Sequence, residues 1–262
     1  MIEVLDQLGG IIHLEKAPQR IVSLVPSQTE LLYDLGLGNG VVGITKFCIH
    51  PDEWFRNKAR IGGTKDVKLD KIRSLNPDLI IGNKEENKQG DIEALRSVAP
   101  VWMSDIYTLQ DAYDMIKGIG EVCEIMDKSE ALIENIQDNF SQLKPANQSK
   151  RVLYLIWKDP YMAAAENTFI DHIITEPLGL KNIMEGEERY PIVELREIEV
   201  PDLIFLSSEP YPFKAKHIAD LEKIFPESKI VLVDGEGFTW YGSRLLNSPA
   251  YFNDLLNRLE LH

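Results

Sequence analysis

The chain has 262 residues, of which 44% are apolar and 27% charged, the proportions of an ordinary soluble protein long enough for two modest domains. Its 28 basic and 42 acidic residues give a net charge of −14. This charge disfavours nucleic acid or an anionic membrane as a partner, because phosphate binding needs a basic surface. No apolar run approaches the roughly 18 residues that a membrane-spanning helix needs.

The chain begins with a segment that does not resemble a signal peptide. Residues 1–6 contain two acids and no basic stretch ahead of an apolar core. We therefore expect either a cytoplasmic protein or an exported one without its leader. Residues 2–14 alternate weakly around Gly9-Gly10, which predicts a small hairpin.

Strands and helices alternate through the first 125 residues. Buried strands are predicted at 20–25, 41–44, 78–81 and 101–104, and helices at 26–35, around Trp54, and at 68–75, 91–98 and 111–125. The first of these helices is expected to open with a capping box at residues 26–30. Such alternation predicts an α/β fold with mainly parallel sheets and crossover helices.

A long amphipathic helix is predicted over residues 127–143. Leu132, Ile136 and Phe140 recur every fourth residue and form one apolar stripe. Asp127 can cap the first amides, and Pro145 follows the last apolar position, where a helix should stop.

The segments on the two sides of this helix carry the same landmarks in the same order. The matching pairs are 20–25 and 151–156, 35–39 and 178–182, 77–80 and 201–204, and 101–105 and 230–234. Four matches in order indicate a structural repeat. We infer two α/β lobes joined by a single long backbone helix. The expected boundaries are 1–110 for the first lobe, 111–146 for the connecting helices and 147–262 for the second lobe.

The second lobe should repeat the plan of the first. Helices are predicted at 169–175, 193–199, 218–225 and 249–259. One strand is predicted to end near Ile156, a second to begin after Pro201, and a third to cover 230–233. The segments 183–191 and 234–243 are expected to be irregular.

Candidate ligand contacts follow the predicted strands, because open parallel sheets bind ligands beyond the carboxyl ends of their strands. In the second lobe these residues are Trp157, Tyr161, Tyr190, Phe238, Trp240 and Tyr241, with Arg244 close by. In the first lobe they are Ser27, Phe47, His50, Lys65, Glu85, Glu86, Asp105 and Tyr107. Aromatic side chains in loops suit a large, flat or chelated ligand. The alternative, that individual rings are loop anchors packed into a lobe edge, stays open.

Catalysis finds little support in the sequence. No G-x-S-x-G or H-E-x-x-H motif is present, so we expect no enzyme and no intrinsic cofactor; a hydrolase has the least support. Cys48 and His50, together with Glu85 and Asp105, could bind a metal ion. The alternatives are a structural His50 before a proline and a solvated acidic loop at Glu85.

Several motifs resemble one protein family. RIVSLVPSQTEL at 20–31, LGL at 35–37, LDKI at 69–72 and LNPDLI at 75–80 are similar to the substrate-binding proteins of ABC importers for cobalamin, ferric siderophores and haem. FTWYGSRL at 238–245 also looks similar. The class in question has two lobes bridged by one backbone helix, and the nearest resemblance is to its cobalamin- and ferric-siderophore-binding members.

This resemblance implies a cobalt- or iron-containing chelate in the cleft between the lobes, delivered to an ABC permease. It implies a monomer in the periplasm or cell envelope whose lobes move by only a few degrees. Docking on the transporter would use one acid per lobe, Asp70 in the first and Glu194 or Glu197 in the second. The alternative is that these are ordinary surface acids.

Two hypotheses follow. In the first, the chain binds a metal chelate without catalysis. The aromatic residues of the second lobe would stack on the chelate, and Arg244, Lys65 and Ser27 would contribute polar contacts. The segment Gly63-Thr64-Lys65 stands where the cobalamin-binding pattern has an aromatic residue, and Lys65 could either favour an anionic chelate or simply point to water. In the second, the same fold serves a cytoplasmic metal-binding or sensing protein, with a bare ion at His50, Cys48, Glu85 and Asp105.

Overall fold

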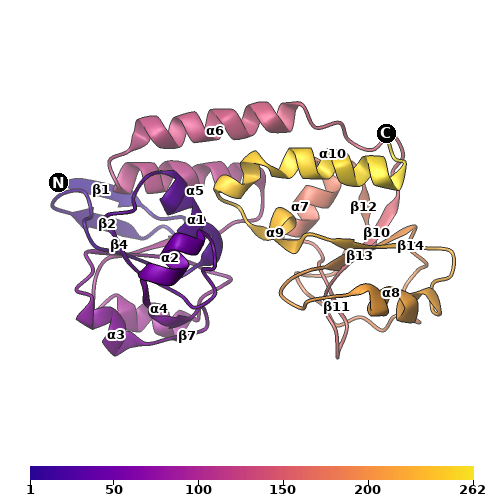
Figure 1. Ribbon diagram of the computed structural model, residues 1–262, viewed down its shortest axis with the longest axis horizontal. Helices are drawn as coiled ribbons and strands as arrows, with labels where there is room; N and C mark the ends of the chain where they lie inside the picture. The colour runs from indigo at the N-terminus through magenta and orange to yellow at the C-terminus, as the bar shows by residue number, and fades with distance from the viewer. The chain divides into compact units, whose positions relative to one another are not determined.

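The computed structural model describes all residues, 1–262, and divides into two compact units. Unit 1 comprises Met1–Ile106, Gln110–Gln137 and Tyr241–Arg244, and unit 2 comprises Tyr107–Leu109, Asp138–Trp240 and Leu245–His262. Each unit is a mixed α/β structure built on a mainly parallel sheet, which confirms the predicted fold class (Figure 1). The segment 111–146, expected to connect the lobes, is divided between the two units, and Tyr241–Arg244 groups with unit 1.

The sheet of unit 1 has five parallel strands in the order β5-β4-β3-β8-β9. These strands are β3 (Ile21–Ser23), β4 (Val41–Ile44), β5 (Ala59–Arg60), β8 (Leu79–Asn83) and β9 (Val101–Ser104). The helices that connect and cover them are α1 (Pro26–Asp34), α2 (Asp52–Asn57), α3 (Leu69–Ser74), α4 (Gln89–Leu95) and α5 (Leu109–Val122). One core cluster, including Val22, Ile72, Ile80 and Leu95, packs helices onto the sheet.

Two small hairpins complete unit 1. The predicted N-terminal hairpin is present as β1 (Ile2–Leu5) and β2 (Ile11–Leu14), and a second one is formed by β6 (Gly62–Gly63) and β7 (Asp66–Val67). Gly62 has a φ of +110° and its missing Cβ would lie 2.3 Å from the Asp66 carbonyl oxygen, so only glycine fits this tight turn.

The sheet of unit 2 follows the order β11-β10-β13-β14, with β12 also paired to β10. Its strands are β10 (Arg151–Trp157), β11 (Met162–Ala163), β12 (Lys181–Asn182), β13 (Leu203–Ser207) and β14 (Lys229–Val233). All pairs are parallel except β10 with β11. Its helices are α7 (Phe169–Thr175), α8 (Ala215–Glu222), α9 (Gly235–Thr239) and α10 (Ser248–Leu259). The short 3₁₀ turn η1 (Ser243–Leu246) begins in unit 1 and ends in unit 2.

The single long helix that joins the units is α6 (Met126–Ser141), close to the predicted 127–143. It begins in unit 1 and ends in unit 2. Only Ser129 and Ile136 are buried on it, as expected for a surface helix with one narrow apolar stripe. Lys128 Nζ donates to the Leu35 carbonyl of unit 1 at 3.0 Å, and Asn139 Nδ2 donates to the Leu246 carbonyl of unit 2 at 2.9 Å.

The repeat extends to individual side chains. The Asp78 carboxylate accepts hydrogen bonds from the amides of Gln19 and Arg20, both at 2.8 Å, and so fixes the entry to β3. Asp202, which occupies the matching position in unit 2, accepts from the Arg151 amide at 2.8 Å at the entry to β10. The Pro-Asp-Leu-Ile motif is therefore repeated because each Asp aligns two neighbouring parallel strands.

Four local predictions were wrong. Asp127, expected to cap the long helix, is instead the second residue of α6. The helix expected at 193–199 is a turn around residues 195–197, and the loop expected at 234–243 contains α9. Helix α1 begins at Pro26 with no side-chain cap at Val25, so its predicted capping box does not form. Proline fits the first helical position because its missing N–H would have no helical partner there.

No helix of the structure is both long and apolar enough to cross a bilayer.

Candidate ligand-binding site

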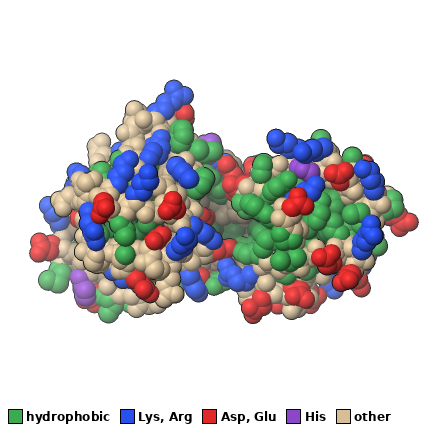
Figure 2. Space-filling view, turned by 90° about the horizontal axis from the view of Figure 1, so that it is seen from below, with side chains coloured by type: hydrophobic (Ala, Val, Ile, Leu, Met, Phe, Trp, Pro, Cys, Tyr) green, Lys and Arg blue, Asp and Glu red, His purple; other side chains and the backbone are tan.

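The carboxyl ends of β10 and β13 in unit 2 carry a group of partly exposed aromatic residues, here named the aromatic platform: Trp157, Tyr161 and Tyr211. Trp157 is 40% exposed and packs edge-on against Tyr211, with ring centroids 5.6 Å apart. The Tyr211 amide donates to the Ile156 carbonyl at 3.4 Å, which joins the two loops. Figure 2 shows a broad apolar area on the right-hand part of the molecule, which is unit 2. Tyr211 was not singled out from the sequence.

The Tyr211 ring packs against two buried side chains. Its ring lies 4.8 Å from Phe213 and 5.7 Å from His217. His217 is 2% exposed, and its Nδ1 accepts from the Lys214 amide at 2.9 Å, so it caps the start of α8. Burial and the nearby carboxylates of Asp159 and Asp220 raise the pKa of Tyr161, which therefore stays a neutral phenol at neutral pH.

A second aromatic group in unit 2 surrounds Arg189. The guanidinium carbon of Arg189 lies 5.6 Å from the centre of the Tyr107 ring and 5.7 Å from that of Tyr190, within the range of cation–π attraction. Arg189 has a φ of +58°, and its backbone N–H bonds to the Glu166 carbonyl at 2.8 Å. Tyr190 is half-buried and lies beside the positive charge of Arg189, a residue that the sequence analysis did not single out.

Glu209 is the charged group at the end of β13. Its Oε1 accepts hydrogen bonds from Thr239 Oγ1 at 2.7 Å and from Trp240 Nε1 at 3.0 Å. Gly235 permits this approach of α9, because a Cβ there would lie 2.6 Å from Glu209 Cγ. Burial and the negative charges of Glu236 and Asp234 raise the pKa of the Glu209 carboxyl, and the two hydrogen bonds oppose that rise.

The C-terminal aromatic residues are buried. Phe238 is fully buried and packs 5.1 Å from Tyr154 and 4.9 Å from Phe252, so it is a core residue and offers no free ring face. Trp240 and Tyr241 are each only 6% exposed. Loop aromatics and core aromatics cannot be distinguished by sequence spacing alone, because both follow a strand.

Arg244 forms an ion pair within unit 1. Its Nε and Nη2 donate to the two carboxylate oxygens of Glu30 at 3.0 and 2.7 Å, a bidentate geometry that fixes both side chains. Ser243 Oγ bonds the Asp34 carboxylate, also on α1. Arg244 therefore has a structural role that attaches Tyr241–Arg244 to α1.

The predicted metal ligands do not form a metal site. No group of three or more His, Cys, Asp or Glu side chains that could hold an ion occurs in the structure. Cys48 is fully buried, with its Sγ 3.1 Å from the hydroxyls of Thr29 and Thr45, and burial raises the pKa of its thiol. Asp105 pairs with Lys84 at 2.6 Å. His50 and Glu85 retain other partners but join no such group.

The carboxyl edge of unit 1 is polar. Asn87 Nδ2 donates to the Thr64 carbonyl at 3.0 Å and its Oδ1 accepts from the Asn83 amide at 2.9 Å, which anchors the turn that carries the exposed Lys65. Exposed Lys46 lies above the Phe47 ring, with Nζ 4.9 Å from its centre. Ser27, in contrast, is only 3% exposed and its hydroxyl has no hydrogen-bond partner.

The acids expected to dock on a transporter are on the surface. The Asp70 side chain is 99% exposed on α3 and lies 3.4 Å from Arg73. Glu194 and Glu197 are exposed too, on the turn that replaces the predicted helix.

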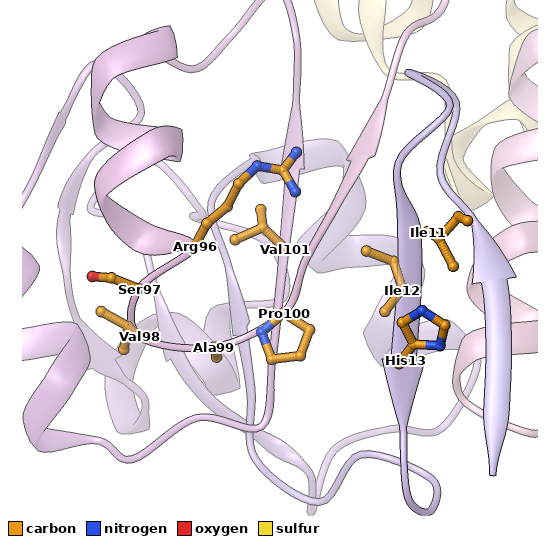
Figure 3. A pocket seen from close by; sticks show the side chains of 9 residues that line it. All are labelled: Ile11, Ile12, His13, Arg96, Ser97, Val98, Ala99, Pro100 and Val101. Carbon is orange, nitrogen blue, oxygen red and sulfur yellow. The ribbon is translucent and has the colours of Figure 1, made fainter.

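A shallow pocket of about 400 Å³ lies elsewhere in unit 1 (Figure 3). It lies between β2 and the amino end of β9, and is lined mainly by aliphatic side chains with His13 and Arg96. Its lining includes no Phe, Tyr or Trp, and it lies at the opposite end of β9 from the polar edge described above.

Comparisons with known proteins agree with this architecture. Residues 21–221 match the periplasmic binding protein family. The uncharacterized ABC transporter substrate-binding lipoprotein YvrC of Bacillus subtilis (strain 168) is 26% identical over 181 residues, which are 64% of this chain and 57% of that relative's own length. The vitamin B12-binding protein of Pectobacterium atrosepticum is 25% identical over 259 residues, 93% of this chain and 90% of the relative.

Solved structures show the same fold at low sequence identity. The periplasmic vitamin B12 binding protein BtuF of Vibrio cholerae has a TM-score of 0.75 and 21% identity, covering 94% of this chain and 99% of that one. The petrobactin-binding protein YclQ of Bacillus subtilis has a TM-score of 0.79 and 17% identity, with 97% of both chains covered. The chain therefore belongs to the periplasmic binding protein family, in the class whose two lobes are joined by one backbone helix.

Proposed function

We propose that this chain binds a metal chelate, cobalamin-like or ferric-siderophore-like, and delivers it to an ABC importer without catalysing a reaction. The observation that carries the proposal is the aromatic platform, whose rings lie partly exposed at the carboxyl ends of β10 and β13. Relatives and structural neighbours named as binding vitamin B12 or petrobactin support the same class of ligand.

The platform suits a large chelate for a physical reason. An indole and two phenols held by buried neighbours lose little conformational entropy on binding and gain stacking and burial of apolar area. The two phenol hydroxyls and the indole N–H can also donate to oxygen atoms of the ligand. We propose Trp157, Tyr161, Tyr190 and Tyr211 as the aromatic contacts and Lys65 as a charged contact. Within unit 2, Phe238 and Trp240 are enclosed and would stabilise the loops that carry these contacts, whereas Ser27, Tyr241 and Arg244 are enclosed or paired within unit 1.

Titration with hydroxocobalamin, haemin and ferric siderophores, followed by tryptophan fluorescence and equilibrium dialysis, tests the proposal. We expect at least one chelate to bind, and Trp157→Ala to weaken that binding about tenfold, since a stacked ring contributes roughly 0.5–1.5 kcal/mol beyond its buried area. Tyr33→Ala is the matched control, because Tyr33 is 39% exposed on α1 of unit 1. If none of the chelates binds, the proposal is wrong.

Transport would require recognition by a permease, for which we propose Asp70 together with Glu194 or Glu197. Full exposure allows Asp70 to reach a basic partner, and a rim charge mainly affects association rate and specificity. Asp70→Lys should leave chelate affinity unchanged and abolish stimulation of the cognate ATPase in proteoliposomes. Unchanged stimulation in Asp70→Lys, Glu194→Lys and Glu197→Lys would remove these residues from the docking surface.

This role implies an exported protein, in the periplasm or attached at the cell envelope, as expected from the family. The other hypothesis, a metal sensor using a bare ion, has no supporting geometry, because Cys48 is enclosed among hydroxyls and Asp105 is paired with Lys84.

A further inference from the structure

Glu209 occupies a central place at the ligand-binding edge of unit 2. Strand β13 lies between β10 and β14 in the sheet, so the loop that follows it lies between the loops that follow its two neighbours. Glu209 comes two residues after the end of β13 and two residues before Tyr211 of the aromatic platform. Trp240, at the end of α9 after β14, lies on its other side.

The two carboxylate oxygens of Glu209 have different surroundings. Oε1 accepts from Thr239 Oγ1 and Trp240 Nε1, and these bonds fix the direction of the side chain. Oε2 accepts no hydrogen bond from the protein, and it is not one of the enclosed polar atoms, so it remains in contact with solvent. A pre-oriented carboxylate therefore presents one unused acceptor atom beside an apolar surface.

The fold does not need this negative charge. A glutamine amide oxygen could accept the same two bonds from Thr239 and Trp240. The charge is in fact unfavourable, since burial together with Asp234 and Glu236 raises the carboxyl pKa above its ordinary value. The sign follows from linkage: the native state holds the Glu209 proton more tightly than the unfolded chain, so its contribution to stability declines as pH rises through the raised pKa. A costly charge at a binding edge indicates a role in recognition.

We infer that Glu209 is a specificity-determining residue whose Oε2 accepts a hydrogen bond from the ligand, and that the ligand is a chelate carrying an amide N–H or ammonium donor. This inference rests on the proposed function and specifies its ligand class. Carboxylate or phenolate groups of a chelate placed at this point would meet a like charge in a poorly solvated site. Neutral chelates with amide side chains and cationic hydroxamate chelates satisfy the requirement, whereas anionic catecholate chelates and haemin do not.

The test compares four probes at pH 7.5 by equilibrium dialysis: cyanocobalamin and ferrioxamine B as donor-bearing chelates, and haemin and a ferric tris(catecholate) as anionic ones. The wild type should bind a donor-bearing probe at least about tenfold more tightly than either anionic probe. Glu209→Gln places an amide at the same point, so it should weaken the preferred probe by about 10- to 100-fold, as expected for a hydrogen bond to a charged group. The same variant should strengthen the anionic probes.

A pH series provides a readout that a purely structural role would not change. Wild-type affinity for the donor-bearing probe should fall as pH is lowered through the raised pKa of Glu209, because the neutral acid no longer attracts the donor. Glu209→Gln should lack that dependence and should melt at the same or a higher temperature at pH 7.5. The control is Glu222→Gln, an exposed acid on α8, which should retain wild-type affinities at every pH.

The possible outcomes distinguish a failure of the inference about Glu209 from a failure of the proposed function. If a probe binds and Glu209→Gln alters neither its affinity nor its pH dependence, the inference about Glu209 is wrong while the proposed function stands. A wild-type preference for an anionic probe also overturns the inference. If no metal chelate of any charge binds the wild type, the proposed function fails and the inference fails with it.

Discussion

The carboxyl edges of the two sheets have the same topology and different chemistry. In unit 1 the strands end in buried polar side chains, among which the Ser104 hydroxyl accepts from Gln28 at 2.6 Å and from Asn83 at 2.9 Å, and the exposed ring at this edge is that of Phe47 beside Lys46. In unit 2 the matching edge carries the exposed ring of Trp157 and the half-buried carboxylate of Glu209. The strands and their Asp anchors specify the fold of each unit. The residues that follow matching strands can therefore differ between the two units without changing the fold.

The largest effect is expected from removing Phe238, a buried ring behind the carboxyl edge of unit 2. Phe238→Ala should destabilise the protein by about 3–5 kcal/mol, because it leaves a cavity among Tyr154, Phe205 and Phe252. Urea denaturation measures the change, and chelate affinity of the folded protein should be retained. Phe47→Ala, at a ring that is 52% exposed in unit 1, should change stability by less than about 0.5 kcal/mol. Lost affinity with unchanged stability would instead make Phe238 a ligand contact.

The repeated Asp anchors allow a direct comparison of the two units. Asp78→Ala removes an acceptor for two amides and should cost about 1–3 kcal/mol. Asp202→Ala removes one amide bond and a partly exposed ion pair with Arg151 Nε at 3.5 Å, and should cost less, because such ion pairs contribute little. Separate spectroscopic probes in each unit during urea unfolding would measure both values. A larger cost at Asp202, or none at either residue, would contradict the assignment of these carboxylates as strand anchors.

The smallest expected effect concerns the two cysteines of unit 1. Burial raises the pKa of the Cys48 thiol and raises that of Cys123 to about 12, so both stay protonated and enclosed at pH 8. A thiol reagent at pH 8 should label neither residue in the native protein and both in urea. Rapid labelling of Cys48 in the native protein would show that the polar edge of unit 1 is open, and would support the hypothesis of a metal site there.

Much of the fold was predictable from local patterns. The strand at Arg20, the Pro-Asp-Leu-Ile motifs and the amphipathic 127–143 segment each combine periodicity with a clear stop signal, and the structure has the corresponding elements. The failures occurred where such signals were weak. Residues 193–199 have charged and apolar residues at nearly helical spacing but form only a turn, and α9 is a five-residue helix within a glycine-rich loop.

The candidate site was less predictable. Aromatic residues after strands were identified, but Phe238 is a core residue, and Tyr211, Arg189 and Glu209 were missed. Glu209 precedes a proline and follows two serines, a sequence that suggests only a turn. No nearby sequence feature predicts that Glu209 accepts hydrogen bonds from Thr239 and Trp240, which are about 30 residues further along the chain.

The internal repeat, the parallel strands and the joining helix could be predicted from the amino-acid sequence, because they depend on hydrophobic periodicity and on local stop signals. The exposure of each ring, the pairing of each charge and the enclosure of both thiols became evident only in the folded chain. Those properties depend on contacts between distant segments: Arg244 is neutralised by Glu30, more than two hundred residues before it. Burial and partner choice therefore separate binding residues from supporting ones.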